Sequence, residues 1–186
     1  MAIHMAGASC AEIRTGKLLL RPIRASDAAM IARHAADRRV AEATQNIPHP
    51  FPPGTAEEFV ARAISGDRQG IVWVIDGTPG GMPDLLGIMS QKPVEVKRGQ
   101  SGQSEIAFWV APDYWNAGVA SEALRALIDA NPLRDSAYFA EVFQDNKATA
   151  RLLSNAGFEY LGDAEAFSRA RGEFLPTWTY ICKLKR

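Results

Sequence analysis

The chain has 186 residues, of which 47% are hydrophobic, and its 21 basic side chains balance its 21 acidic ones. This length and composition predict one globular domain with a substantial core, and the zero net charge argues against a nucleic-acid partner. Because no apolar run is long enough to span a bilayer and no secretory leader is recognisable, we expect no membrane partner and a cytoplasmic location.

The cysteines and histidines point to no special chemistry. Cys10 and Cys182 are too few for a disulfide framework, and no His or Cys cluster has metal-ligand spacing. A reducing compartment fits this usage best, and we expect no metal. His34 lies within a predicted helix, where a surface or half-buried side chain is favoured over a catalytic one.

Residues 1–16 are expected to form a flexible arm. Within it, His4-Met5 is compatible with a cloning junction and a native start at Met5. After the arm, strands are expected to alternate with single helices. Apolar, β-branched and aromatic runs predict strands at 17–23, 70–77, 85–90, 106–110, 137–142, 158–162 and 174–184. Helical spacing and cap residues predict helices at 26–37, 55–65, 118–130 and 145–155, the second opened by a capping box. Four prolines make 44–54 a stiff loop. This order indicates a mixed α/β or α+β layered domain.

The stretch 104–124 is the most informative part of the chain. A buried strand at 106–110 is followed by a break at 111–117, and the next helix opens with the small residues Gly118, Ala120 and Ser121. Unpaired N–H groups and the helix dipole make such a helix start a phosphate cradle. Two interpretations stay open from this stretch alone, because small residues also open many helices that bind nothing.

Two separate motifs resemble the GNAT superfamily of acyl-CoA-dependent N-acetyltransferases. Residues 104–124 resemble its acetyl-CoA signature, and residues 146–158 followed by Gly162 resemble its Asn-x-x-Ser-x-x-Val-Leu-x-x-x-Gly-Phe segment. Leu20-Arg21-Pro22 and the 47–51 loop resemble the branch that includes the ribosomal-protein N-terminal acetyltransferases. The resemblance implies an α+β fold with a single domain over residues 17–186. It also implies a central, mixed but mostly antiparallel twisted sheet, about four helices on its two faces, and a splayed strand pair that holds CoA.

The resemblance further implies transfer of an acetyl group from acetyl-CoA to a primary amine, by direct attack in a ternary complex. The acceptor would be a protein N-terminus or a small amine. The residues expected to bind acetyl-CoA are Trp109, Val110 and Ala111 through their backbones, Asn116, Ala117, Gly118, Val119, Ala120 and Ser121 at the pyrophosphate, and Asn146 at the pantetheine or acyl end. The Val110 N–H would polarise the thioester carbonyl. Asn146 is equally compatible with a plain helix N-cap.

Catalytic roles follow from the same resemblance. Glu105 is expected to accept the amine proton, directly or through a water, and its alternative is a solvated carboxylate at a strand end. Thr149 is expected to reach the departing sulfur, and its alternative is a hydroxyl bonded to its own helix backbone. Ser154 is a weaker candidate for the same task.

Four positions depart from the family pattern. Trp115 stands where Gln or Arg is usual, Asn116 where Gly is frequent, Leu153 where many members carry a Tyr acid, and Pro176 where an Asp is often seen. The missing Tyr and the missing Gln or Arg keep a second class open, a catalytically silent acyl-CoA-binding or sensor module. The cradle does not depend on these side chains, because its hydrogen bonds come from backbone N–H groups.

Acceptor specificity is expected to come from the 44–54 loop, the first two helices and the hairpin at 168–175. Their residues do not identify an acceptor, and the sequence leaves a monomer and a homodimer equally open.

Overall fold

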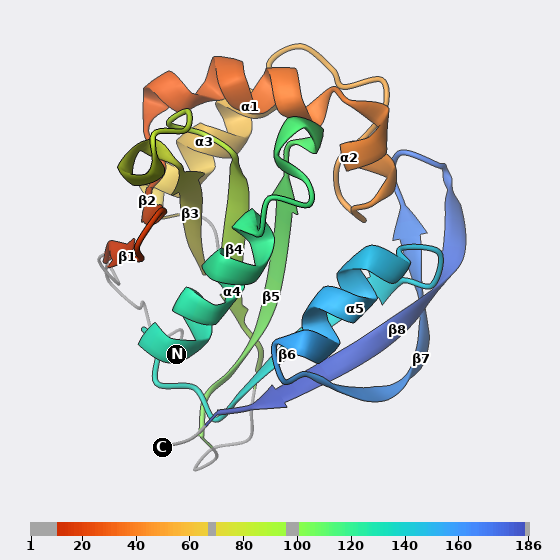
Figure 1. Cartoon of the computed structure of the whole chain (residues 1–186). Helices are drawn as coiled ribbons and strands as arrows, with labels where there is room; N and C mark the ends of the chain where they lie inside the picture. The colour runs from red at the N-terminus through yellow and green to blue at the C-terminus, as the bar shows by residue number, and fades with distance from the viewer. Residues whose placement is uncertain (1–10, 67–69, 96–100, 185–186) are drawn as a thin grey trace, which may run out of the picture.

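The computed structural model describes residues 11–66, 70–95 and 101–184, and one eight-stranded sheet forms its centre (Figure 1). The order across the sheet is β1-β2-β3-β4-β5-β6-β8-β7, and every neighbouring pair is antiparallel except β5 and β6. The mixed, mostly antiparallel sheet is therefore confirmed. The strands are β1 (Ile13–Arg14), β2 (Leu19–Pro22), β3 (Ile71–Asp76), β4 (Gly87–Pro93), β5 (Gln103–Val110), β6 (Ala137–Phe143), β7 (Glu159–Ser168) and β8 (Glu173–Lys183).

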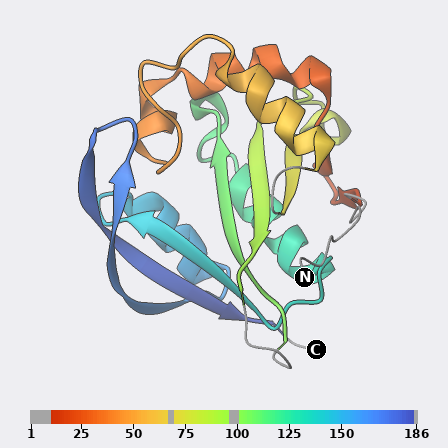
Figure 2. The ribbon, with the colours of Figure 1, turned by 180° about the vertical axis from the view of Figure 1, so that it is seen from behind.

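Five α-helices, where about four were expected, and three short 3-10 turns fill the connections between the described strands. α4 and α5 cover one face of the sheet, and α1 and α3 pack on the other (Figures 1 and 2). The helices are α1 (Ala28–Ala35), α2 (Arg38–Glu42), α3 (Thr55–Ser65), α4 (Val119–Ala130) and α5 (Lys147–Asn155), and the 3-10 turns are η1 (Ala25–Asp27), η2 (Thr78–Gly80) and η3 (Pro112–Tyr114).

The additional helix is α2, which follows the helix predicted at 26–37 after a break at Asp37. Asp37 leaves the helical conformation, with φ −67° and ψ 122°, and its carboxylate accepts a hydrogen bond from the Arg39 N–H at 2.9 Å. An aspartate in this conformation caps a new helix start.

Two local expectations were wrong. Within the arm predicted at 1–16, residues 1–10 lie outside the described part, but Ile13–Arg14 forms β1 and pairs with β2. The predicted capping box at Thr55 is absent, because α3 begins at Thr55 itself and Gly54 caps it with φ 81°. A glycine supplies this left-handed conformation without steric cost, so the chain turns into the helix there.

Two apolar clusters, one on each face, determine which way the β5 side chains point. Ile106 and Val110 belong to the cluster beneath α4 and α5, together with Leu124 and Leu153. Trp109 packs on the cluster of α1 and α3. Because side chains alternate along a strand, Glu105 and Ala107 share the face of Trp109. The Glu105 side chain thus lies on the face of the sheet that α1 and α3 cover.

The parallel strands β5 and β6 pair only at their first residues. Gln103, Ser104 and Glu105 are in register with Ala137, Tyr138 and Phe139, and no later residue of β5 pairs with β6. β6 continues along β8 through Phe143, while β5 continues along β4 through Val110. The predicted splayed strand pair is confirmed, and the two strands diverge from a shared end (Figure 1).

A buried polar network holds the closed end of this pair. The Asp135 carboxylate accepts hydrogen bonds from Gln91 Nε2 at 2.8 Å and from Ser104 Oγ at 2.5 Å. Asn131 accepts from the Asp135 N–H at 2.8 Å and from the Tyr138 hydroxyl at 3.2 Å. Burial raises the pKa of Tyr138, so its phenol stays protonated and can donate. The network fixes the register in which the strands meet and therefore the point where they part.

Candidate active site

A cavity of about 600 Å³ occupies the space between the splayed strands. Its walls come from β4, β5, β6, α2 and the loop after it, α3, the turn before α4, and the first turns of α4 and α5. The lining residues are Val40, Ala43, Thr44, Gln45, Asn46, Ile47, Phe59, Ile88, Ser90, Glu105, Ile106, Ala107, Phe108, Trp109, Val110, Tyr114, Trp115, Asn116, Gly118, Val119, Ala120, Ser121, Glu141, Val142, Phe143, Asn146, Ala148, Thr149 and Leu152.

The start of α4 forms one end of this cavity. Gly118 caps the helix with φ 79° and without a side-chain cap, and a Cβ added there would meet no atom within 4 Å. Asn116, at φ 60°, also adopts the left-handed conformation, which asparagine tolerates better than most residues. Together these two residues turn the chain so that the backbone of the first helical turn borders the cavity. The helix dipole adds partial positive charge at the same place.

Most of the predicted cradle residues meet at this end. Asn116, Gly118, Val119, Ala120 and Ser121 all line the cavity, whereas Ala117 lies in the turn between them without lining it. The Val119 side chain itself is buried in the core, with 3% of its surface exposed. Only its backbone can therefore serve a ligand.

The register of β5 decides which of its backbone groups face the cavity. Val110 is opposite Gly87, and the Ala111 N–H donates to the Leu86 carbonyl at 2.8 Å. In an antiparallel ladder this places Val110 at a position whose N–H and C=O point away from β4, and those of Trp109 toward it. Of Trp109, Val110 and Ala111, which were expected to bind acetyl-CoA through their backbones, Val110 is thus the one whose backbone faces the cavity. Phe108, which the sequence did not suggest, has the same orientation.

Trp115 closes the turn before α4. Its Nε1 donates to the Val110 carbonyl at 2.7 Å, and the Arg39 guanidinium lies 5.7 Å from its ring centroid. The residue that departs from the family pattern therefore ties the cradle turn to β5. This contact leaves the Val110 N–H directed toward the cavity.

The start of α5 forms the wall opposite α4. Asn146 caps the helix, since its Oδ1 accepts from the Thr149 N–H at 3.1 Å, and both residues line the cavity. The N-cap alternative for Asn146 is confirmed, and its position at the cavity is compatible with a ligand contact as well. Ser154 instead donates to the Ala150 carbonyl at 3.1 Å and does not line the cavity. Of the two candidates for the sulfur contact, Thr149 is therefore the one that lines the cavity.

Two carboxylates, Glu105 and Glu141, lie on the α1 and α3 face of the splay. Glu105 is half-buried and in register with Phe139, so Glu141, two residues further along β6, points to the same face. The Glu141 carboxylate accepts a hydrogen bond from the Thr177 hydroxyl of β8. The sequence analysis did not single out Glu141. An acid within an otherwise apolar strand is a weak signal without the strand's orientation.

Trp109 of β5 and Phe143 of β6, on the same face as these carboxylates, each lie against a side chain of a neighbouring element. Trp109 meets the His34 ring edge to face, with centroids 6.4 Å apart, and burial followed by the charge of Arg33 lowers the pKa of His34. Arg171, in the β7–β8 turn, lies over Phe143 and forms an ion pair with Asp145. The half-buried position predicted for His34 is confirmed, and a neutral imidazole is favoured there.

The α2 loop and the β7–β8 turn are joined directly. Arg171 donates to the Glu42 carbonyl at 2.9 Å, and the Arg169 N–H donates to the Gln45 carbonyl at 3.0 Å. Two of the segments expected to select the acceptor therefore form one continuous wall.

The GNAT acetyltransferase domain family matches residues 17–159. The chain belongs to this family. It is accordingly an N-acetyltransferase, and acetyl-CoA is the acyl donor that the cradle, the splay and the Val110 backbone fit.

Individual relatives agree with this assignment. A phosphinothricin N-acetyltransferase of Streptomyces coelicolor is 27% identical over 123 residues, which cover 66% of this chain and 72% of the relative. Among solved structures, the ribosomal L7/L12 α-N-protein acetyltransferase RimL in complex with coenzyme A superposes with a TM-score of 0.78 at 14% identity, covering 94% and 98% of the two chains. A ribosomal-protein-S5-alanine acetyltransferase of Vibrio fischeri gives 0.76 at 16% identity, covering 93% and 96%. The fold is thus that of the branch which the sequence resembled.

The described residues contain no group of three or more His, Cys, Asp or Glu side chains arranged to hold a metal ion. None of their helices is both long and apolar enough to cross a membrane.

Proposed function

We propose that this enzyme transfers the acetyl group of acetyl-CoA directly to a primary amine while both substrates are bound. The observation that carries the proposal is one continuous cavity with two chemically different ends. A helix start suited to the phosphates of CoA borders one end, and Glu105 borders the other, with Val110 between them. A single cavity of this kind lets donor and acceptor meet without a covalent enzyme intermediate.

Three groups of the chain would perform the chemistry. Glu105 accepts a proton from the ammonium of the acceptor, which frees the nitrogen lone pair for attack on the thioester carbon. The Val110 N–H donates to the carbonyl oxygen as negative charge develops on it. As the carbon–sulfur bond breaks, the Thr149 hydroxyl donates a hydrogen bond to the departing sulfur. CoA leaves as the thiol after taking the second proton, which the attacking nitrogen loses as it becomes an amide.

The remaining contacts with acetyl-CoA are inferred from where the residues lie along the cavity. The N–H groups of the first turn of α4 bind the pyrophosphate, with Asn116 and Gly118 giving the turn its shape. The amide of Asn146, which caps α5 with its oxygen, presents its nitrogen toward the pantetheine or acyl end. Trp109 and Ala111 support this surface by packing and by their ladder contacts with β4.

A turnover assay tests the proposal. The purified protein is incubated with acetyl-CoA and a panel of small amines and short peptides, and both CoA release and acetyl mass gain are measured. We expect acceptor-dependent CoA release with a matching gain of one acetyl group. Tight binding of acetyl-CoA without release for any acceptor would instead identify the silent acyl-CoA-binding or sensor module.

A further inference from the structure

The charges in the cavity are all of one sign. Of the described residues that line it, only Glu105 and Glu141 carry an ionised side chain. Within the described ranges, neither carboxylate forms an ion pair. Both point into the acceptor half of a site already identified by its fold and its cradle, so their charge bears on the acceptor.

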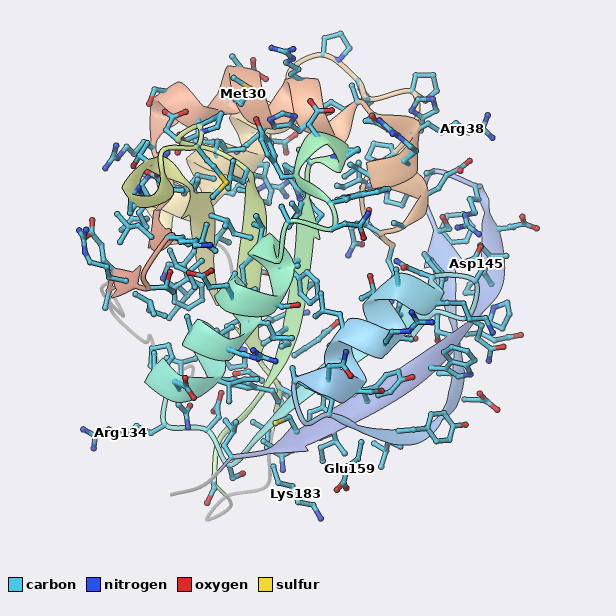
Figure 3. All side chains as sticks on the ribbon, viewed as in Figure 1. Met30, Arg38, Arg134, Asp145, Glu159 and Lys183 are labelled. Atoms are coloured by element: carbon cyan, nitrogen blue, oxygen red, sulfur yellow. The ribbon has the colours of Figure 1, made fainter. Side chains whose placement is uncertain are left out.

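Lys92 of β4 is the register partner of Glu105, so this basic side chain is the nearest to that carboxylate; it is exposed, does not line the cavity and forms no ion pair with Glu105. Two other basic side chains near the cavity are engaged elsewhere. Arg39 pairs with Asp37 and lies over Trp115, and Arg171 pairs with Asp145. Figure 3 shows the labelled Arg38, Arg134 and Lys183 extending outward from the molecule. The register partner of Glu141 on β8 is Thr179 and not a basic residue, so the part of the cavity at Glu141 favours a cation over an anion.

The two carboxylates are separated along the splay. Glu141 lies two residues beyond Phe139, the register partner of Glu105. With about 3.3 Å of rise per residue and about 4.8 Å between strands, their Cα atoms are roughly 8 Å apart, and more where β6 diverges. A short aliphatic chain with an ammonium at each end can contact both carboxylates, one at each end.

The Glu141 carboxylate is held in place. Thr177, which is fully buried in β8, donates its hydroxyl to Glu141 and leaves the remaining acceptor positions of the carboxylate for a ligand. Phe143, two residues further along the same face of β6, lines the cavity, and so does Ala107 on β5. These apolar side chains beside the carboxylates suit the methylene chain that joins two ammonium groups.

We infer that Glu141 is a specificity-determining residue that binds the second cationic group of an aliphatic diamine, while the amine to be acetylated lies at Glu105. The inference rests on the proposed acetyl transfer, and it adds the acceptor class. An amine that carries a carboxylate in place of the second ammonium is repelled by Glu141. A monoamine loses the second contact altogether.

The experiment compares three matched acceptors with the full chain and acetyl-CoA: 1,4-diaminobutane, 1-aminobutane and 4-aminobutanoate. We expect kcat/KM to fall at least about tenfold from the diamine to the monoamine, and further to the amino acid. Glu141→Gln keeps an oxygen for Thr177, so it should raise KM for the diamine at least about tenfold with kcat nearly unchanged. The monoamine should be unaffected by it. Glu165→Gln, at an exposed position of β7, is the matched control and should change nothing.

Several results would overturn the inference. Equal use of the three amines by the wild-type protein would do so without any variant, and so would a preference for short neutral peptides that is unchanged in Glu141→Gln. Calorimetric titration of 1,4-diaminobutane into the CoA-bound protein separates the two proposals. Binding that needs Glu141 but gives no CoA release would contradict acetyl transfer and support the role of Glu141 in binding the second ammonium group. Absence of both binding and turnover would contradict that role of Glu141.

Discussion

The two ends of the cavity present different kinds of chemical groups. At the α4 end the groups on offer are backbone N–H donors, and the side chains around them are small or turned into the core. At the acceptor end the groups on offer are two carboxylates on separate strands. A backbone site tolerates exchange of its side chains as long as the turn keeps its shape. A side-chain site depends on each residue and on the register that aligns it.

This comparison explains why the departures from the family pattern do not dismantle the cradle. Trp115 and Asn116 replace the usual residues, yet the turn keeps two left-handed positions, and Trp115 anchors it to the Val110 carbonyl. At the acceptor end, by contrast, exchange of either carboxylate removes the group that would contact the ligand. Four predictions test the contrast, and they are ordered from the largest expected effect to the smallest.

The largest effect is expected at Glu105. Glu105→Gln retains the shape of the side chain and removes the proton acceptor, so kcat should fall by about 10² to 10⁴. The remaining activity should rise toward alkaline pH, where the amine loses its proton without help. Steady-state rates across pH measure this, and calorimetry should show unchanged acetyl-CoA affinity. Wild-type turnover at every pH would eliminate Glu105 as the base.

The next effect concerns charge at the cradle. Gly118→Asp places a carboxylate in the open space at the α4 start, where it repels the pyrophosphate. Acetyl-CoA affinity should fall at least about tenfold, or about 1.4 kcal/mol, as measured by calorimetric titration. Gly118→Asn is the control, because it has the same size and a similar backbone preference without the charge. Equal losses in both variants would attribute the effect to backbone strain.

A smaller effect is expected at Thr149. A hydrogen bond of ordinary strength contributes about 0.5–1.5 kcal/mol, so Thr149→Ala should lower kcat by about three- to tenfold. Acetyl-CoA affinity should change little, because the bond strengthens only as charge builds on sulfur. Thr149→Ser restores the oxygen and should recover most of the rate. If the Ala and Ser variants have the same kcat, the hydroxyl has no part in the transfer.

The smallest effect is expected at Asn116. Asn116→Gly replaces a side chain at φ 60° with the residue that adopts this conformation most easily. If the cradle acts through its backbone, acetyl-CoA affinity should stay within about twofold of the wild-type value. A large loss of affinity would show that the Asn116 amide itself binds the cofactor, and the contrast between the two ends would be weaker than proposed.

Local sequence determined much of this protein. The strand at 106–110, the small-residue helix start and the Asn146 cap are written in neighbouring residues, because caps, turns and short periodic runs depend on contacts within a few positions. The order of these elements indicated a mixed α/β or α+β domain and the small-residue helix start indicated the cradle, while the resemblance of two motifs implied the family and its mostly antiparallel sheet. At Asp37 a single polar residue caps a second helix, which the prediction missed. At Gly54 the predicted helix bounds of 55–65 were correct, and only the capping box was wrong.

Only the tertiary structure decided the rest. The orientation of the Val110 backbone follows from its pairing with Gly87, and the face of Glu141 follows from a three-residue register between β5 and β6. That register depends on Asp135, Ser104 and Gln91, which meet from three distant parts of the chain. A shift of one residue would turn every side chain of β6 to the other face. The acceptor end therefore exists only in the folded sheet, whereas the cradle is already encoded in one continuous stretch.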